Sequence, residues 1–275
     1  MQPAFRTAPW PPLRNALLSL LRQHRPHTYW GFGEVDVTDA VSAIRRHERT
    51  LRIAVSFHAF VMHCLARAAA DHPNLLTYRH GRRLIAFADA DVGTVVDRRL
   101  PDGVRLPVGY IVRGAQDKSP AAINWELRRA IRVDRLDSES LRLRRNVARM
   151  PGWVRRLASW RIMRNPFMLR RFHGTIGLTN LRNPALHAPF HALPPNIYTY
   201  TLAIGSMFER ITLDAQGRPE KRKVLCLSAG ADHAVIDGMA LTAFAARLAH
   251  LLQSGHGLGD EFVEETRQLM SEQPG

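Results

Sequence analysis

The chain has 275 residues and a mass of 31.1 kDa, and its 45% hydrophobic and 23% charged residues are typical of a globular protein. This apolar content excludes a mainly disordered chain, and no apolar run is long enough for a transmembrane helix. The formal net charge of +15 indicates an anionic partner. Two cysteines, Cys64 and Cys226, suffice for neither a disulfide framework nor a metal site, and without a secretory signal we expect a cytoplasmic protein.

The first third of the chain predicts one strand followed by two helices. Residues 28–38 alternate in polarity, which favours a strand, and Thr38 is one of two residues that can cap a short helix reaching residue 46. Ser56 then begins a strongly apolar helix, which ends before Pro73.

Short strands and a further capped helix follow. We expect strands at residues 75–78, 83–88, 92–96 and 106–112, with a turn at residues 101–103. Ser119 and Pro120 predict the start of the next helix, because serine caps helix N-termini and proline is favoured at the first helical position.

Most of the excess charge lies in one basic segment, Arg128 to Arg171. It contains 14 arginines and three acidic residues, which gives it a net charge of +11. Pro151-Gly152 and Pro166 divide it into two or three helices. Aromatic residues are interleaved with the arginines, so the segment either packs on its own domain or docks on an anionic surface such as a membrane.

The last third predicts strands, one helix and a polar end. Strand patterns cover residues 175–179, 197–204, 211–213 and 223–228, and a helix covers residues 239–252. Strands and helices do not alternate regularly, so we predict an α+β fold with a mixed sheet.

The candidate chemistry lies between the last strand and this helix, in the sequence Asp232-His233-Ala234-Val235-Ile236-Asp237-Gly238. A histidine on such a turn can act as a general base near neutral pH, with the aspartate four residues later orienting it or bracing the loop. By themselves these residues are equally consistent with a structural role, in which His233 is an ordinary loop histidine and Asp237 is the N-cap of the helix.

Other histidines are weaker candidates. His187 and His191 are four residues apart, but Pro189 lies between them, so a helical metal pair is not expected. His58 and His63 fall on the apolar helix and predict core or interface positions. We therefore predict no metal site.

Longer stretches resemble a known family. The run from Ala203 to Met239 is similar to the C-terminal half of the catalytic domain of 2-oxoacid dehydrogenase acyltransferases, which ends in the same Asp-His-x-x-Ile-Asp-Gly pattern. Residues 174–181 resemble the family's G-T-F-T-I-S-N-L strand, and residues 112–119 resemble the segment before its next helix. The resemblance covers about residues 25–253 and implies the chloramphenicol acetyltransferase-like fold.

The family mechanism implies roles for three residues. His233 would be the general base that takes the proton of a coenzyme A thiol or of an acceptor thiol or hydroxyl. Thr179 stands where the family has a serine, whose hydroxyl stabilises the oxyanion, although a buried strand threonine is its simpler role. Asp237 would be structural and would pair with an N-terminal arginine, for which Arg14 and Arg22 are the candidates.

The resemblance also implies how the chain is organised. We expect an N-terminal arm at residues 1–24, a catalytic domain at 25–255 that includes the 128–171 basic segment, and a polar tail at 256–275. We expect a freestanding catalytic domain without a covalent lipoyl group, and a homotrimer whose active sites lie between subunits.

The leading hypothesis is thus an acyltransferase that uses acyl-coenzyme A, with the acyl group and acceptor left open. Its basic segment would dock an acidic acyl carrier protein or an anionic membrane surface, or hold coenzyme A phosphates. Docking on a membrane would make the protein peripheral to that membrane. The alternative is a non-catalytic trimeric scaffold or binding module of the same fold. Nucleic acid is not an expected partner, because no recognised binding motif accompanies the charge.

Overall fold

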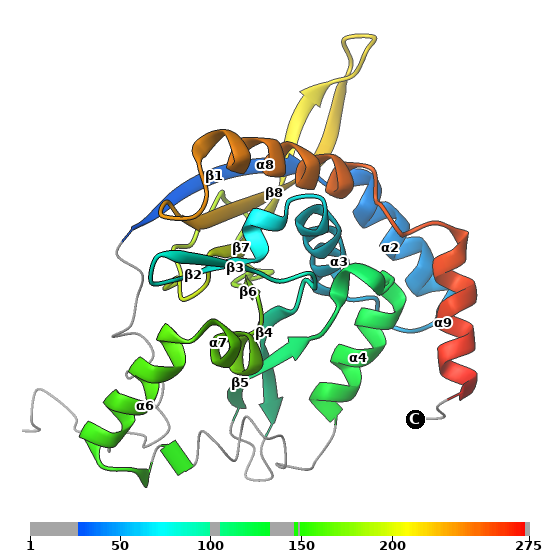
Figure 1. Ribbon diagram of the computed structural model, residues 1–275. Helices are drawn as coiled ribbons and strands as arrows, with labels where there is room; N and C mark the ends of the chain where they lie inside the picture. The colour runs from blue at the N-terminus through cyan, green and yellow to red at the C-terminus, as the bar shows by residue number, and fades with distance from the viewer. Residues whose placement is uncertain (1–26, 100–104, 133–145, 148, 273–275) are drawn as a thin grey trace, which may run out of the picture.

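The computed structural model describes residues 27–99, 105–132, 146–147 and 149–272 (Figure 1). A six-stranded sheet forms its centre, in the order β1-β8-β7-β6-β4-β5. Strand β6 pairs in parallel with β4 and β7, whereas the other neighbours are antiparallel, so the sheet is mixed as predicted. The strands are β1 (Thr28–Asp36), β4 (Val92–Arg99), β5 (Arg105–Val112), β6 (Ile176–Asn180), β7 (Tyr200–Leu213) and β8 (Pro219–Asp232).

Helices flank this sheet, and a two-stranded hairpin lies beside it. The helices are α2 (Thr38–Leu51), α3 (Phe57–Ala70), α4 (Pro120–Arg132), α6 (Gly152–Arg164), α7 (Pro166–His173), α8 (Gly238–Gln253) and α9 (Asp260–Glu272). The hairpin consists of β2 (Thr77–His80) and β3 (Arg83–Ala86), and 3-10 turns occur at Pro73–Leu76 and Ala115–Asp117. None of the described helices is long and apolar enough to cross a membrane.

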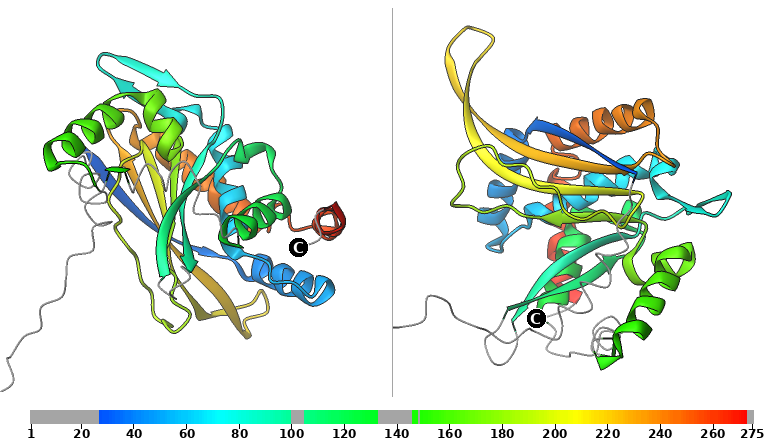
Figure 2. Two further views of the ribbon diagram at one scale, coloured as in Figure 1. Left: turned by 90° about the horizontal axis from the view of Figure 1, so that it is seen from below. Right: turned by 90° about the vertical axis from the view of Figure 1, so that its left-hand side faces the viewer.

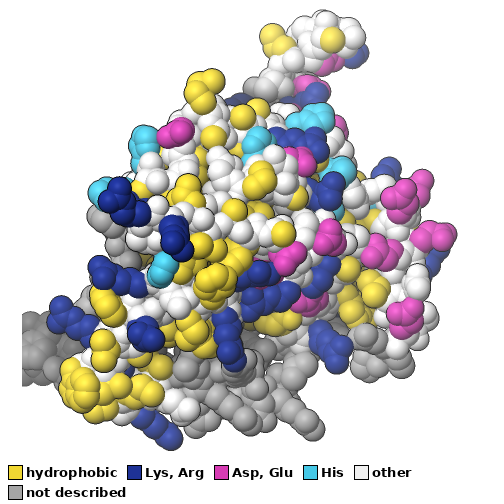
Figure 3. Space-filling model, in the orientation of Figure 1, with side chains coloured by type: hydrophobic (Ala, Val, Ile, Leu, Met, Phe, Trp, Pro, Cys, Tyr) yellow, Lys and Arg dark blue, Asp and Glu magenta, His cyan; other side chains and the backbone are white. Residues whose placement is uncertain are grey.

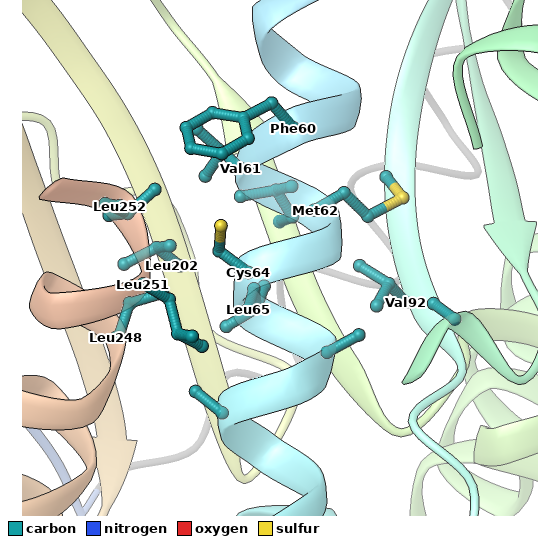
Figure 4. Close-up of a cluster of buried hydrophobic side chains, with 14 of the residues drawn as sticks. Phe60, Val61, Met62, Cys64, Leu65, Val92, Leu202, Leu248, Leu251 and Leu252 are labelled. Carbon is teal, nitrogen blue, oxygen red and sulfur yellow. The ribbon is translucent and has the colours of Figure 1, made fainter. Parts of the chain in front are cut away.

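The main core forms where α3 packs between the sheet and its neighbouring helices (Figure 2, left). Figure 4 shows Phe60, Met62 and Leu65 of α3 among side chains of α8 and the sheet, including Leu248 and Leu202. Ten of the 14 residues of α3 are buried, which explains why its sequence is apolar all round. This core fixes the positions of β6, β7 and β8.

Two predicted helix caps are confirmed, whereas the cap expected at Thr38 is wrong, because α2 begins at Thr38 itself and Val37 occupies the N-cap position without a side-chain cap. The Ser56 hydroxyl accepts a hydrogen bond from the Ala59 N–H at 3.3 Å, and α3 follows. The Ser119 hydroxyl accepts one from the Ala122 N–H at 3.0 Å, and α4 begins at Pro120. These helix starts are decided by residues close in sequence, so the sequence alone locates them.

Three predicted elements differ from the structure. The strand expected at residues 75–78 is a 3-10 turn that gives way to β2 only at Thr77. The separate strands expected near residues 197–213 and 223–228 form one long hairpin, β7–β8, which projects beyond the body in Figures 1 and 2. The expected polar tail contains α9, which packs on α4 and α2 and buries Phe262. The turn expected at residues 101–103 lies outside the described residues.

The two faces of the sheet have different surroundings. Leu178, Leu202 and Leu227 point toward the helical core, so the residues that alternate with them lie on the opposite side, here called the outer face. Strand register aligns Thr179, Ala203, Ser228 and Phe32 across this outer face in one row.

Candidate active site

The turn after β8 holds His233 by a set of backbone hydrogen bonds. The Asp232 N–H donates to the Thr199 carbonyl at 2.9 Å, and the His233 N–H donates to the His27 carbonyl at 3.0 Å. The Asp232 carboxylate accepts from the Ala234 N–H at 3.1 Å, which closes the turn. Since the backbone is fixed on both sides, the imidazole projects from a defined place at the end of the sheet.

The His233 side chain is exposed and lies against one aromatic ring. Its ring centroid is 4.9 Å from that of Tyr29, with the planes inclined at 52°. The Tyr29 hydroxyl donates to the Ile236 carbonyl at 3.3 Å, and burial, aided by the negative charge of Asp237, raises the pKa of Tyr29. A neutral phenol therefore braces the imidazole. Neither ring nitrogen of His233 has a hydrogen-bond partner among the described residues.

Asp237 occupies the N-cap position of α8 but does not cap it. Its backbone is extended, with φ −84° and ψ 158°, and its carboxylate forms no capping hydrogen bond. The carboxylate is exposed and makes no ion pair with any described residue. Arg14 and Arg22, the expected partners, lie outside the part of the chain that the structure describes.

Thr179 is far from His233 within one chain. On β6 it aligns with Ala203 of β7, which aligns with Ser228 of β8. His233 lies five residues farther along, which corresponds to roughly 16 Å in the strand direction at the usual rise per residue. The structure therefore does not bring these two predicted residues together within the chain. The Thr179 hydroxyl has no partner among the described residues.

The outer face around Thr179 is partly uncovered. Phe32, in the same row, is 57% exposed, and Val95 on β4 is 53% exposed. The Ser228 hydroxyl is buried there without a hydrogen-bond partner among the described residues. Phe190 and Leu193, on the loop that crosses this face, are also exposed. An apolar sheet face of this kind is typical of a surface that another molecule covers.

The basic segment lies elsewhere, and one of its arginines, Arg170, is already paired with two carboxylates. Arg170 Nε and Arg113 Nη1 donate to the same oxygen of the buried Asp91 carboxylate at 2.8 and 2.9 Å, and Arg170 also pairs with Asp89 at 2.6 Å. Burial of Asp91 acts to raise its pKa, but hydrogen bonds from Arg170, the Gly114 N–H and Arg113 outweigh this and hold the pKa below its usual value. This cluster therefore fastens α7 to the sheet.

Helix α6 presents a different part of the basic segment to solvent. None of its residues is buried, and Trp153, Leu157 and Trp160 follow one another at helical spacing along one side. Trp153 is 72% exposed, and Phe167 at the start of α7 is 63% exposed. Figure 3 shows apolar side chains gathered over this region at the lower left, with arginines beside them.

Sequence reasoning missed Tyr29 and Ser228 as neighbours of the site. Tyr29 reaches His233 because β1 pairs with β8 over its whole length, a pairing between segments about 200 residues apart. Ser228 enters the row of Thr179 only through two strand registers. No local pattern marks either residue.

Comparison with known proteins shows the family and the fold of the chain. Residues 3–142 and 195–258 match the family described as 2-oxoacid dehydrogenases acyltransferase (catalytic domain). The chain therefore belongs to this acyltransferase family, and it has the α+β, chloramphenicol acetyltransferase-like fold that the sequence predicted. Thr179 and most of the basic segment lie between the two matched ranges. No curated protein sequence matches the chain significantly.

Solved structures of the same fold cover nearly the whole chain. A probable dihydrolipoamide acetyltransferase from Listeria monocytogenes is 16% identical, with a TM-score of 0.64 over 91% of this chain and 95% of that one. The cubic core of a pyruvate dehydrogenase multienzyme complex is 17% identical, with a TM-score of 0.64 over 94% and 95% of the two chains. The dihydrolipoamide acetyltransferase of Azotobacter vinelandii is 18% identical, with a TM-score of 0.61 over 94% of this chain and 95% of that one.

Proposed function

We propose that the protein is a coenzyme A-dependent acyltransferase in which His233 is the general base. The observation that carries this proposal is the state of the His233 side chain. Its imidazole is exposed, held by a fully bonded turn, braced by Tyr29 and free of hydrogen bonds to any described side chain. A structural histidine would use its ring nitrogens within the fold, whereas a general base must keep one available for its substrate.

The chemistry would be direct acyl transfer. His233 would take the proton from the coenzyme A thiol, or from an acceptor thiol or hydroxyl, as the resulting nucleophile attacks the acyl carbonyl. The Thr179 hydroxyl would donate a hydrogen bond to the oxyanion of the tetrahedral intermediate. His233 would then return the proton to the departing group, and Asp237 would take no part in proton transfer.

A relative supports this assignment of roles. The structural work on the Azotobacter vinelandii enzyme concerns a serine, a histidine and an asparagine in its catalytic mechanism, with the asparagine four residues after the histidine. Here Asp237 follows His233 by the same spacing. A hydroxyl residue, Thr179, precedes His233 by about fifty residues, as the serine precedes the histidine in that enzyme.

The site would be completed by a second copy of the chain, in a homotrimer. Within one chain His233 and Thr179 are roughly 16 Å apart along the strands, too far for both to contact one acyl carbonyl. The exposed apolar residues of the outer face, Phe32 and Leu193 among them, would be covered by the neighbouring subunit. His233 of one subunit would then face Thr179 of the next.

The basic segment would dock the protein on an anionic partner. Exposed Trp153 and Trp160 on α6, flanked by arginines, favour an anionic membrane surface, because aromatic side chains insert at the interface while arginines contact headgroups. An acidic acyl carrier protein would need mainly the charges, which is how an experiment separates the two.

The primary test replaces the proposed base. We expect His233→Ala to lower turnover of acyl-coenzyme A with a thiol acceptor by about 100-fold or more, since general bases contribute at least that much. His250→Ala, which changes an exposed histidine on α8, is the matched control and should retain full turnover. A folded His233→Ala protein with unchanged turnover would refute the assignment, and an inactive wild type would favour a non-catalytic scaffold.

A further inference from the structure

A cluster of three metal-ligand side chains lies on the outer face, apart from the residues proposed for catalysis. Glu34 of β1 and Cys226 of β8 are direct cross-strand partners. His191 reaches them from the loop between β6 and β7. A carboxylate oxygen, the Cys226 sulfur and one ring nitrogen of His191 all lie within 4.8 Å of one another. Three segments far apart in sequence thus place three different donor types around one point.

Two of the donors have the outer contacts that orient metal ligands. Nδ1 of His191 lies 3.1 Å from the Leu227 carbonyl oxygen, and donation to that oxygen leaves the lone pair on Nε2. Arg210 Nη2 donates to Oε2 of Glu34 at 2.6 Å, which leaves the other carboxylate oxygen free. Ligating histidines and carboxylates usually have such partners, which fix the tautomer and the orientation of the ligand.

The loop that carries His191 is itself fastened to the sheet. The Phe190 N–H donates to the Ser206 hydroxyl at 2.8 Å, and the Ser206 N–H donates to the Phe190 carbonyl at 3.1 Å. A side chain at Gly205 would collide with that carbonyl oxygen, so the glycine is what lets the loop lie this close. His191 is therefore held beside Cys226 by the backbone on its N-terminal side.

We propose that Glu34, His191 and Cys226 form a binding site for one zinc-class divalent metal ion, with water as the fourth ligand. Thiolate, imidazole and carboxylate are the three donor types that zinc takes in proteins. The thiolate and the carboxylate together balance the charge of the ion, and the Cys226 proton passes to solvent on binding.

The geometry requires only a local contraction. Zinc–ligand bonds of about 2.0 to 2.3 Å in a tetrahedral site put the donor atoms about 3.5 Å apart. The present separations of up to 4.8 Å therefore close by about an ångström, which small rotations of Glu34 and His191 supply. The bound ion would tie the loop to β1 and β8 and so stabilise the outer face.

Cobalt and zinc titrations of the purified protein test the site, in buffer with a non-thiol reductant. We expect one Co²⁺ per chain with a thiolate-to-cobalt charge-transfer band, its displacement by Zn²⁺, and a higher melting temperature in the presence of Zn²⁺. Cys226→Ala and His191→Ala should each weaken Zn²⁺ affinity by at least about 100-fold, since even outer-contact changes cost 10 to 100-fold. Glu34→Gln should weaken Zn²⁺ affinity as well. Because Glu34 is partly exposed, this variant tests the site even if one of the other two fails to fold.

His187→Ala is the matched control, because this exposed histidine lies on the same loop outside the cluster. It should bind Zn²⁺ as the wild type does. Absence of the charge-transfer band, or equal Zn²⁺ affinity in the Cys226→Ala and wild-type proteins, would overturn the proposal. Loss of binding in His187→Ala but not in His191→Ala would also overturn it, because the ion would then be held elsewhere.

Discussion

A site shared between subunits predicts that two inactive variants restore each other's activity. His233→Ala removes the base but leaves the Thr179 hydroxyl, and Thr179→Val removes the hydroxyl in a residue of nearly the same shape. We expect the first to lower turnover by about 100- to 10,000-fold. We expect the second to lower it by about 100- to 1,000-fold, the usual effect of losing one oxyanion donor.

The magnitude of recovery follows from the ring geometry. In a closed trimer each His233 faces the Thr179 of one defined neighbour, so the interface is directional. Any mixed trimer, whether it contains one or two copies of a given variant, then has one interface with both residues intact. We therefore expect mixed trimers to show about one third of wild-type turnover, well above either parent.

Co-expression of the two variants with different affinity tags, followed by purification on both tags, isolates the mixed species. Release of free thiol from acyl-coenzyme A measures turnover, and light scattering checks that the mass is three times that of the 31.1 kDa chain. Differently tagged copies of His233→Ala alone serve as the control and should remain inactive. If the mixed trimers are as inactive as their parents, the two residues do not share a site across subunits. A monomer in light scattering would refute the geometry directly.

Two further predictions concern the basic segment and its anchoring. Charge at Asp91 stabilises the fold: because its pKa is lowered in the folded protein, this stabilisation is complete above the unfolded pKa of about 3.9 and is lost as pH falls through the lower folded pKa. We expect Asp91→Asn to lower the free energy of unfolding at pH 7 by about 3 kcal/mol in urea titrations, because it breaks a buried ion pair. The variant should also lose less stability than the wild type when the pH falls below 4. An unchanged unfolding midpoint at pH 7 would contradict this prediction. Reversing Arg155, Arg156, Arg161 and Arg164 to glutamate should abolish sedimentation with anionic vesicles while turnover of free acyl-coenzyme A stays nearly unchanged. Changing Trp153, Trp160 and Phe167 to serine should weaken vesicle binding too, and retention of binding after this change would indicate a protein partner instead. If either the arginine or the aromatic variant folds as a trimer but loses turnover of the free thioester, the segment belongs to the active site.

The local features of the fold could be predicted from the sequence because short-range physics decides them. The caps at Ser56 and Ser119 depend on hydrogen bonds that span three residues. The start of α8 after Asp237 and the turn at His233 follow from a strand, a tight turn and a helix that are contiguous in the chain. The family pattern around His233 is likewise contiguous, so the candidate base was visible without a structure.

The long hairpin and the last helix were predicted less well because their polar residues hide the pattern. Toward the tip of β7–β8 lie pairs such as Lys221 and Glu209, whose charged groups are 3.8 Å apart across the hairpin and neither of which falls in a predicted strand. Charges that neutralise each other across two strands look like loop residues when read singly. The polar helix α9 is held on the domain by the buried Phe262, whose ring stacks on that of His47 with the centroids 5.0 Å apart.

What the tertiary structure alone decided is which distant residues meet. Strand register separates Thr179 from His233 within the chain and makes a shared site necessary for the proposed mechanism. Pairing of β1 with β8 brings Tyr29 to the imidazole, and the same pairing sets Glu34 opposite Cys226. The physical reason is that a sheet's register is fixed by burial of one whole face against the helical core, a collective property that no short stretch of sequence contains.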